Sequence, residues 1–470
     1  MAFDNERTKQ LKVAVVGGGM CGLVAALGLR KAGIDVDLYE SARRLLESKF
    51  GEIGAGVGLG PNAIRVLEQL ELLDDVLARI APEMPVPRPF RYLSGFEDHE
   101  LIYDYPTNTE DKGLGIHRSA EVAYLCICER KLMFYTHRVT FLEALVHLVD
   151  SNKTHFNKRC IGLSIPSDSR VQINFADGTS AEADVALGAD GIRSNVRSFV
   201  VAPAEQENSV NGNEIKATVM RAVFTNTYAY RGLVPTEELR KLGVKTDFTK
   251  RPICLTGSEK QHIITFPIKN GTVINVVAFT CERSYPWGAK PIPQDKPWVT
   301  PRTTSELLAE YAGFGRDALM LLSCIAKPSV WAVHAVDPPL EAYVRGRVAV
   351  LGDAAHGMLP HLGAGAGQAL EDAFLLVKLL SHPKAHTDNV EVILKAYDTI
   401  RRPRGNMVLT TSTKVGDIYE GYGPSELSTG ELTPEGLRAD VEGIWDDIWH
   451  HDLEADIEAA IALLVDAGAF

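Results

Sequence analysis

The feature that most constrains this chain is a glycine-rich turn near its start, Gly17-x-Gly19-x-x-Gly22. An apolar run at residues 12–16 precedes the turn, a stretch with helical spacing of apolar residues follows it, and an alternating run then ends at Glu40. In such a unit the first glycine permits a tight turn, the second lets the backbone approach a pyrophosphate, and the third lets helix and strand pack closely. Glu40 is placed to hydrogen-bond ribose hydroxyls. The pattern predicts a Rossmann-like dinucleotide-binding domain for NAD or FAD, and the alternative is that the glycines serve only a turn.

Two later motifs favour FAD. Residues 184–197 have the pattern of an apolar strand that runs into Asp190 and a helix start. Residues 347–372 combine a strand, Asp353 and a glycine-rich loop at 363–367 that opens a long helix. An aspartate at a strand end can accept a hydrogen bond from a ribityl hydroxyl, and backbone N–H groups at a helix N-terminus suit a phosphate or a flavin ring edge. A chain that binds only NAD has no need of these extra sites, whereas the long, bent FAD does.

Composition excludes several other classes of function. The 470 residues are 45% hydrophobic and 23% charged with a net charge of -12, which is typical of a globular protein and argues against a nucleic-acid partner. No apolar run reaches the roughly 18 residues of a membrane span, and the polar N-terminus lacks the apolar core of a signal peptide. The seven cysteines form no disulfide framework, which favours a reducing, cytoplasmic location.

No metal site is expected. Cys126 and Cys128 are too close for a metal pair, and His450-His451 have no convergent third ligand. The motifs of metalloproteases, serine hydrolases and P-loop nucleotidases are absent. Several charged groups of the C-terminal region are interpreted as exposed helix faces: Asp446–Asp452, Arg401-Arg402 and Arg404.

Strand and helix patterns divide the chain into regions. Further strand-like runs lie at 171–176, 183–190, 262–268, 272–279 and 347–353. Strand patterns dominate between 205 and 305, and long helical patterns follow from 363 onward. We therefore expect an α/β fold with three parts. A Rossmann-like FAD-binding domain is expected at residues 1–200 and 306–400, an inserted β-sheet substrate domain at 201–305, and a C-terminal helical region at 401–470.

The three nucleotide-binding motifs, in this order, resemble those of the class A flavoprotein aromatic hydroxylases of the p-hydroxybenzoate hydroxylase type. Further segments are similar to the salicylate hydroxylases of that family: AYRGLVP (229–235), INVVAFTCERS (274–284), residues 352–380, AYDTIRRPR (396–404) and IWHHDLEADI (448–457). The resemblance implies the corresponding FAD-binding fold, with FAD as the bound cofactor. It implies FAD contacts from Gly17, Gly19, Gly22, Glu40, Gly54, Ala55, Gly56, Arg138, Asp353, Gly363, Ala364, Gly365 and Ala366.

One segment departs from the family pattern. Arg138 belongs to an HR-x-x-F-L-x-A-L motif, but His117-Arg118 also matches the start of that motif. Removing residues 119–138 would restore the continuous sequence GIHRVTFLEAL. We interpret these residues as an in-frame addition, such as a translated short intron, and the alternative is a surface excursion of the fold.

The resemblance also implies a reaction. NADH, or NADPH, reduces FAD, and one oxygen atom from O₂ is then transferred to an electron-rich aromatic ring. The expected substrate is a small ortho-hydroxybenzoate, above all salicylate, which would lose CO₂ to give catechol. The alternatives are a polyketide-derived acid of the orsellinate or 6-methylsalicylate kind, and, in another class, a flavin-binding dehydrogenase that does not oxygenate.

A carboxylate substrate needs a cation, and two arginines are candidates. Arg283 follows an apolar strand at a place where the salicylate hydroxylase pattern has an arginine, and a guanidinium can hold a carboxylate through two hydrogen bonds. Arg231, between apolar neighbours, is the second candidate. The alternatives are a surface ion pair for Arg283 and a structural pair between domains for Arg231.

Histidines and phenylalanines complete the predicted site. His361 lies beside the flavin loop and could accept the phenolic proton, because an imidazole titrates near neutral pH. His262 would share one face of its strand with Phe266 and contact the substrate. Phe266 and Phe279 could wall an aromatic ligand. The alternatives are that His361 only fills the pocket, that His262 is an ordinary hydrogen-bonded residue of the sheet, and that both phenylalanines belong to the core. His356 is interpreted as structural and close to the flavin.

Overall fold

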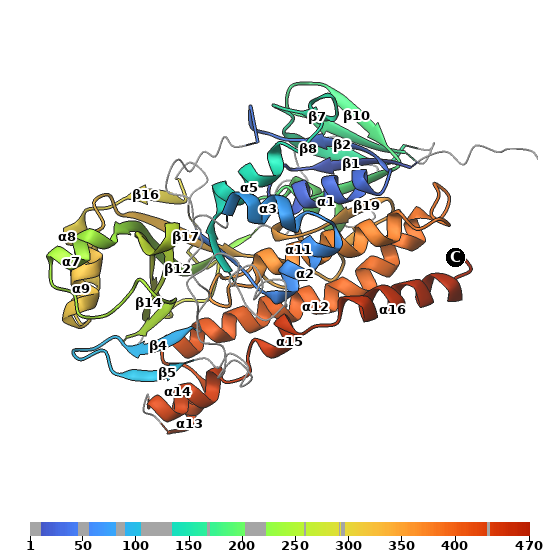
Figure 1. The fold of residues 1–470 in the computed structure, drawn as a ribbon. Helices are drawn as coiled ribbons and strands as arrows, with labels where there is room; N and C mark the ends of the chain where they lie inside the picture. Colours follow the sequence, from blue (N-terminus) through green and yellow to red (C-terminus); the bar gives the residue numbers. More distant parts are fainter. Residues whose placement is uncertain are drawn as a thin grey trace, which may run out of the picture.

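The computed structural model describes residues 11–45, 56–80, 90–104, 134–166, 170–202, 222–257, 260–290, 292, 297–429 and 433–470. One sheet, with β12, β14 and β17, lies at the left of Figure 1, and a second, with β1 and β2, lies at the upper right. Helices α1, α2 and α11 lie between the sheets in this view, and the long α12 and α16 run along the lower side. The fold is mixed α/β, as predicted.

The six-stranded sheet contains the predicted nucleotide-binding unit. β1 is parallel to both of its neighbours, β2 and β11, and α1 (Met20–Lys31) connects β1 to β2. Gly33 follows α1 with a φ of +85°, as expected for a residue that ends a helix in the left-handed region. The strands in spatial order are β18 (Val344–Arg345), β19 (Val348–Val350), β11 (Val185–Gly188), β1 (Lys12–Val16), β2 (Asp35–Tyr39) and β7 (Thr154–His155).

The eight-stranded sheet has two different faces. On one face Val234, Ile263 and Val276 pack with the apolar residues of α7 (Thr236–Lys241), α8 (Thr304–Glu310) and α9 (Arg316–Ser323). The opposite face carries Tyr92 and Ile264, which pack with the C-terminal part of α12 (Val390–Tyr419). The strands in spatial order are β16 (Val299–Pro301), β17 (Ser329–Ala335), β12 (Val223–Pro235), β15 (Val273–Cys281), β14 (Gln261–Ile268), β13 (Ile253–Thr256), β4 (Arg91–Ser94) and β5 (Leu101–Asp104).

The predicted strands at 262–268 and 272–279 are confirmed as β14 and β15. The sheet also takes β4 and β5, from residues 91–104, and β17, from residues 329–335, and these strands lie outside the expected 201–305 segment. β4 joins it by parallel pairing with β13. The division of the chain into domains at the boundaries given above stays a prediction.

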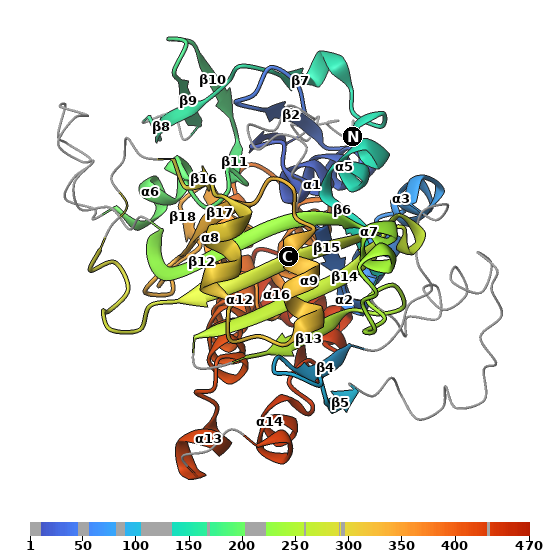
Figure 2. The same cartoon turned by 90° about the vertical axis from the view of Figure 1, so that its left-hand side faces the viewer.

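Figure 2 looks onto the eight-stranded sheet, with α8 and α9 in front of its strands. The described part of the chain contains further helices and strands. They are β3 (Gly56–Leu59), α2 (Pro61–Gln69), α3 (Leu73–Ile80), β6 (Phe134–His137), α5 (Arg138–Val146), η3 (Ser151–Lys153), β8 (Cys160–Ser164), β9 (Val171–Phe175), β10 (Ser180–Ala183), α6 (Asn195–Val201), η6 (Lys269–Gly271), α10 (Asp353–His356), α11 (Gly365–Leu380), α13 (Pro424–Thr429), α14 (Pro434–Val441), α15 (Asp446–Trp449) and α16 (Leu453–Asp466). None of the described helices is both long and apolar enough to cross a membrane.

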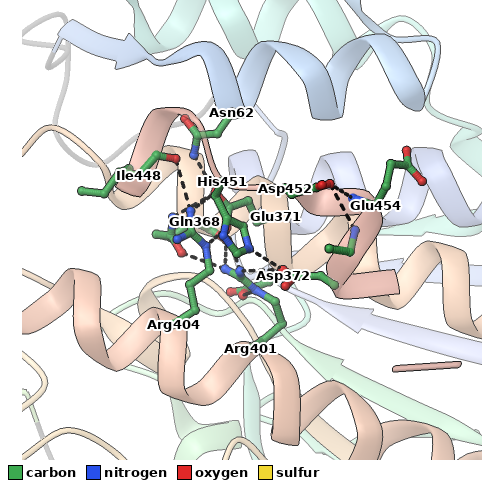
Figure 3. Close-up of polar contacts among 12 residues, drawn as sticks. Asn62, Gln368, Glu371, Asp372, Arg401, Arg404, Ile448, His451, Asp452 and Glu454 are labelled. Carbon is green, nitrogen blue, oxygen red and sulfur yellow. Dashed lines mark hydrogen bonds and ion pairs between the residues drawn. The ribbon is translucent and has the colours of Figure 1, made fainter. Parts of the chain in front are cut away.

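Two arginines of α12 are buried, so the prediction of an exposed face was wrong for them (Figure 3). Arg401 Nη1 donates to Glu371 Oε2 at 2.6 Å, and Arg401 Nε donates to Asp372 Oδ1 at 2.8 Å. Arg404 Nε also donates to Glu371 Oε2, at 2.6 Å. Arginine is rarely fully buried unless it is paired, and α11 supplies the carboxylates that make burial possible. The acidic residues of the 446–452 run are exposed, as expected.

Candidate active site

The three glycines of the nucleotide-binding turn meet different steric demands. Gly17 has a φ of +107°, and a Cβ there would collide with the backbone of Ala189. A Cβ on Gly22 would collide with the carbonyl oxygen of Gly17. A Cβ on Gly19, by contrast, would meet no described atom within 4 Å, so the space beside this residue is open at the N-terminus of α1. This arrangement is the one that a pyrophosphate needs in order to approach backbone N–H groups.

Glu40 lies directly against this turn. Its Oε2 accepts a hydrogen bond from the Gly18 N–H at 2.6 Å, and its Oε1 accepts one from the Ala42 N–H at 2.7 Å. The carboxylate is therefore held at the end of β2, beside the glycines. The position fits the predicted contact with the ribose hydroxyls of a nucleotide.

The second glycine-rich loop leads into the N-terminus of α11. Gly363 has a φ of +65°, and Ala364 precedes a helix of 16 residues that begins at Gly365 and Ala366. No side chain in the described part of the chain caps this helix end, so its N–H groups can serve an anion or a ring edge. Asp353 begins α10 with an exposed side chain. These residues fit FAD, and their contacts with it stay predictions.

Part of the predicted FAD site lies outside the described residues. Gly54 and Ala55 fall there, and so do residues 119–133, which are most of the proposed addition. Gly56 begins β3 and pairs with the last residue of β6. Arg138 begins α5, but its side chain is not among the described ones.

Three predicted site residues come together in a buried cluster on the eight-stranded sheet. His262 and Phe279 are directly opposite each other on β14 and β15, and their rings stack with centroids 4.6 Å apart. His361, from the loop before α11, lies edge-on to both, at 5.0 Å from His262 and 4.8 Å from Phe279. The loop before α11 and the eight-stranded sheet therefore meet at these three rings.

Burial keeps both imidazoles neutral. Burial, assisted by Arg283, lowers the pKa of His262 to about 3, and burial together with His262 lowers the pKa of His361 to about 3. The expectation that His361 titrates near neutral pH was therefore wrong for this arrangement. Both nitrogens of His262 and the Nδ1 of His361 have no hydrogen-bond partner among the described residues. Buried polar atoms are normally hydrogen-bonded, so these three nitrogens indicate that a polar group of a ligand binds here.

Arg283 lies beside the cluster and holds two carboxylates. Its Nη2 donates to Glu420 Oε2 at 2.6 Å, and its Nη1 is 2.7 Å from Asp417 Oδ1. The guanidinium also lies over the ring of Tyr422, 4.2 Å from its centroid. Its Nε is buried and has no hydrogen bond to a described residue. The ion pair between Arg283 and Glu420 is therefore not an ordinary surface pair, because Glu420 is almost fully buried.

Arg231 and Phe266 lie on the same face of the sheet as the cluster. Residues two apart on a strand share a face, which places Arg231 with Ala229 on β12 and Phe266 with His262 on β14. The Arg231 guanidinium lies 4.7 Å from the centroid of the Trp331 ring on β17, at the edge of β12 away from β15. Phe266 is buried. Roles for both residues in binding substrate stay predictions.

The C-terminal end of α12 contributes residues that the sequence analysis missed. A Cβ on Gly416 would collide with the His361 ring, so glycine allows this close approach. The Tyr419 ring lies 5.2 Å from that of His262, and the Tyr419 hydroxyl is 3.0 Å from that of Tyr92. Glu420 Oε1 lies 3.4 Å from His262 Nδ1, without forming a hydrogen bond. No local motif marks these residues, because their partners are on distant strands.

The predicted structural role of His356 fits its contacts. Its Nε2 lies 2.6 Å from Asp372 Oδ2, and the same oxygen accepts a hydrogen bond from the Gly352 N–H at 2.9 Å. Asp372 also binds Arg401. His356 thus ties the loop around Asp353 to the buried charges of α11 and α12.

Comparison with known proteins agrees with this geometry. A model of the FAD binding domain family matches residues 10–412. A salicylate hydroxylase from Pseudomonas putida is 37% identical over 464 residues, which cover 97% of this chain and 95% of that protein. The solved structure of a salicylate hydroxylase substrate complex matches with a TM-score of 0.77 and 33% identity, over 96% of this chain and 98% of that one. The 6-methylsalicylate 1-monooxygenase atA of Aspergillus terreus is 29% identical over 482 residues, covering 99% of this chain and 94% of that protein.

The fold, the nucleotide-binding turn and the match to the FAD binding domain family thus define a flavin-binding oxidoreductase. The chain belongs to the FAD-dependent monooxygenases of the class A aromatic hydroxylase family, with FAD and NADH or NADPH as its cofactors. Membership of this family favours oxygenation over the alternative of a non-oxygenating dehydrogenase.

Proposed function

We propose that this monooxygenase converts salicylate to catechol and CO₂ with NADH and O₂. The observation that carries the proposal is the buried group of His262, His361 and Phe279 beside Arg283. This group offers an aromatic ring surface, unpartnered nitrogens for a phenol and a cation for a carboxylate. The 37% identity to a salicylate hydroxylase supports the same substrate class.

The proposed reaction balances as salicylate, NADH, O₂ and two protons giving catechol, CO₂, NAD⁺ and water. FAD, when bound, supplies electron transfer from the nicotinamide and the activation of O₂. Arg283 would orient the carboxylate, and Phe279 would lie against the aromatic ring. A neutral imidazole of His262 or His361 would accept a hydrogen bond from the phenol and so increase electron density at the carbon that is attacked. Burial of these groups keeps water from the reacting atoms.

A second candidate substrate is a methyl-substituted hydroxybenzoate of polyketide origin. The 29% identity to a 6-methylsalicylate 1-monooxygenase over nearly the whole chain favours it. The same residues would then bind the carboxylate and the phenol. The extra methyl group would need additional space against the ring-binding residues.

Turnover of a panel of acids tests the proposal. Purified FAD-loaded protein is mixed with NADH and salicylate, 6-methylsalicylate or 4-hydroxybenzoate, and both NADH oxidation and products are followed. We expect salicylate to accelerate NADH oxidation most and to yield catechol, and NADPH to be the poorer reductant. Faster turnover of 6-methylsalicylate would favour the second candidate. A response to 4-hydroxybenzoate alone would contradict both.

Replacing Arg283 with alanine is expected to weaken salicylate binding by about 2–5 kcal/mol, because the substrate carboxylate would lose its charged partner. The dissociation constant is measured by titration of the oxidised protein with salicylate, monitored by flavin fluorescence. R316A is the matched control, since Arg316 is exposed at the start of α9 on the other face of the sheet. Unchanged salicylate affinity in R283A would remove Arg283 from the site.

A further inference from the structure

Glu420 carries a buried carboxylate at the end of α12. Its side chain is 2% exposed, and its backbone N–H is fixed by helical hydrogen bonds to Gly416 and Asp417. One carboxylate oxygen accepts from Arg283 Nη2 at 2.6 Å, and the other lies 3.4 Å from His262 Nδ1. The carboxylate therefore lies between the arginine and one of the unpartnered imidazoles of the candidate site.

The charges around Arg283 do not favour a further anion. Among the described residues, the charged groups in contact here are one cation, Arg283, and two carboxylates, Glu420 and Asp417, which leaves one excess negative charge. His262 and His361 are buried and neutral and do not offset it. An incoming substrate carboxylate would add a second excess negative charge at a site of low dielectric, where like charges repel strongly.

We propose that Glu420 occupies the place of the substrate carboxylate on Arg283 in the free protein, and that it takes up one proton when a carboxylate substrate binds. This inference rests on the proposed function, because it assumes an anionic aromatic substrate at Arg283. The protonated carboxyl group releases its ion pair with the guanidinium and can donate a hydrogen bond to a neutral acceptor such as His262 Nδ1, which lies 3.4 Å from Glu420 Oε1. The proton comes from solvent, and no covalent bond of the protein changes.

Glu420 is a better proton acceptor than its neighbours. Burial raises its pKa, although the ion pair with Arg283 acts in the opposite direction. Asp417 also has a raised pKa from burial, but its side chain is 37% exposed, so water can solvate its charge. The other titratable groups that interact with Glu420 are the neutral Cys281 and Tyr311, and the main-chain N–H of Lys260 donates to its carbonyl oxygen.

The sign of the pH dependence follows from this arrangement. A bound carboxylate raises the pKa of Glu420 further, so the complex holds one more proton than the free protein at neutral pH. Salicylate binding should therefore weaken as the pH rises, by up to about tenfold per pH unit where a full proton is taken up. A substrate without a carboxylate should show no such dependence.

Proton uptake on binding is the direct test. Oxidised FAD-loaded protein without NADH is titrated with salicylate at about pH 7.5 in buffers of different ionisation heats, and the dependence of the binding heat on the buffer gives the number of protons. We expect about one proton taken up with salicylate and none with salicylamide, which has a neutral amide in place of the carboxylate. No uptake with salicylate, or equal uptake with both ligands, would overturn the inference.

Two variants identify the group that takes up the proton. In E420Q we expect no proton uptake, together with a salicylate affinity that no longer changes with pH, whereas D417N should keep the uptake. Loss of uptake in D417N with persistence in E420Q would also overturn the inference. If salicylate binds neither to the wild type nor to the two variants, the proposed function fails together with this inference. Binding and turnover without proton uptake would overturn this inference alone and leave the proposed function standing.

Discussion

Replacing Glu371 with glutamine is expected to lower the free energy of unfolding by about 3–5 kcal/mol, the cost of breaking a buried ion pair by removing one partner. The Glu371 carboxylate has no exposed surface and accepts hydrogen bonds from Arg401, Arg404, Asn62 and Gln368 (Figure 3). Glutamine keeps the shape but leaves two buried arginines with one carboxylate fewer. Urea unfolding of the FAD-loaded protein, followed by tryptophan and flavin fluorescence, measures the change.

The same carboxylate makes the stability of the folded protein depend on pH. Burial alone would raise the pKa of Glu371, but Arg401 and Arg404 outweigh burial and lower the pKa to about 2. Its contribution to stability is therefore complete above the ordinary glutamate pKa and is lost as the pH falls from there toward 2. The difference between wild type and E371Q should shrink over that range. E458Q on the exposed side of α16 is the control and should change stability by less than about 0.5 kcal/mol; an equally small effect of E371Q would contradict the account.

A valine at Gly19 is expected to weaken FAD binding by about 1–3 kcal/mol, which is roughly five- to 150-fold in the dissociation constant. A side chain there meets no described atom of the protein itself, so the fold should accept it. The same side chain would occupy the space through which the pyrophosphate approaches the N-terminus of α1. FAD content after gel filtration and the dissociation constant from flavin fluorescence measure the effect.

Two other glycines provide the contrast for this prediction. Gly162 on β8 is also open to a side chain, but it lies away from the nucleotide-binding turn, so G162A should bind FAD as wild type does. G22A should lose both FAD and stability, because its Cβ would collide with the Gly17 backbone. Normal FAD affinity in G19V would show that the cofactor phosphates do not lie at this turn.

The nucleotide-binding half of the fold was predictable because its signals are local. Gly17, Gly22 and Glu40 belong to one strand–helix–strand unit. A Cβ on Gly22 would collide with Gly17, and Glu40 accepts a hydrogen bond from the Gly18 N–H, so both contacts lie within that unit, whereas the backbone that Gly17 must avoid belongs to the distant Ala189. Alternation along β14 likewise predicted that His262 and Phe266 share a face. Short-range periodicity is sufficient for such features.

The buried charges were not predictable, because their partners are distant in the sequence. Glu420 meets Arg283 across 137 residues, and Glu371 meets Arg401 across 30. Helical spacing indicates which charged residues share a face, but not whether another element supplies counter-charges that allow burial. For this reason Arg401 was expected in solvent, and the part of the site on α12 was missed.

The most direct test of the proposed function follows the atoms of the reaction. The protein is supplied with NADH, oxygen-18 gas and salicylate labelled with carbon-13 in its carboxyl group. The account predicts catechol with one oxygen-18 atom and an equal amount of labelled CO₂. A dihydroxybenzoate that keeps the labelled carboxyl group, or NADH oxidation that yields only hydrogen peroxide, would contradict it.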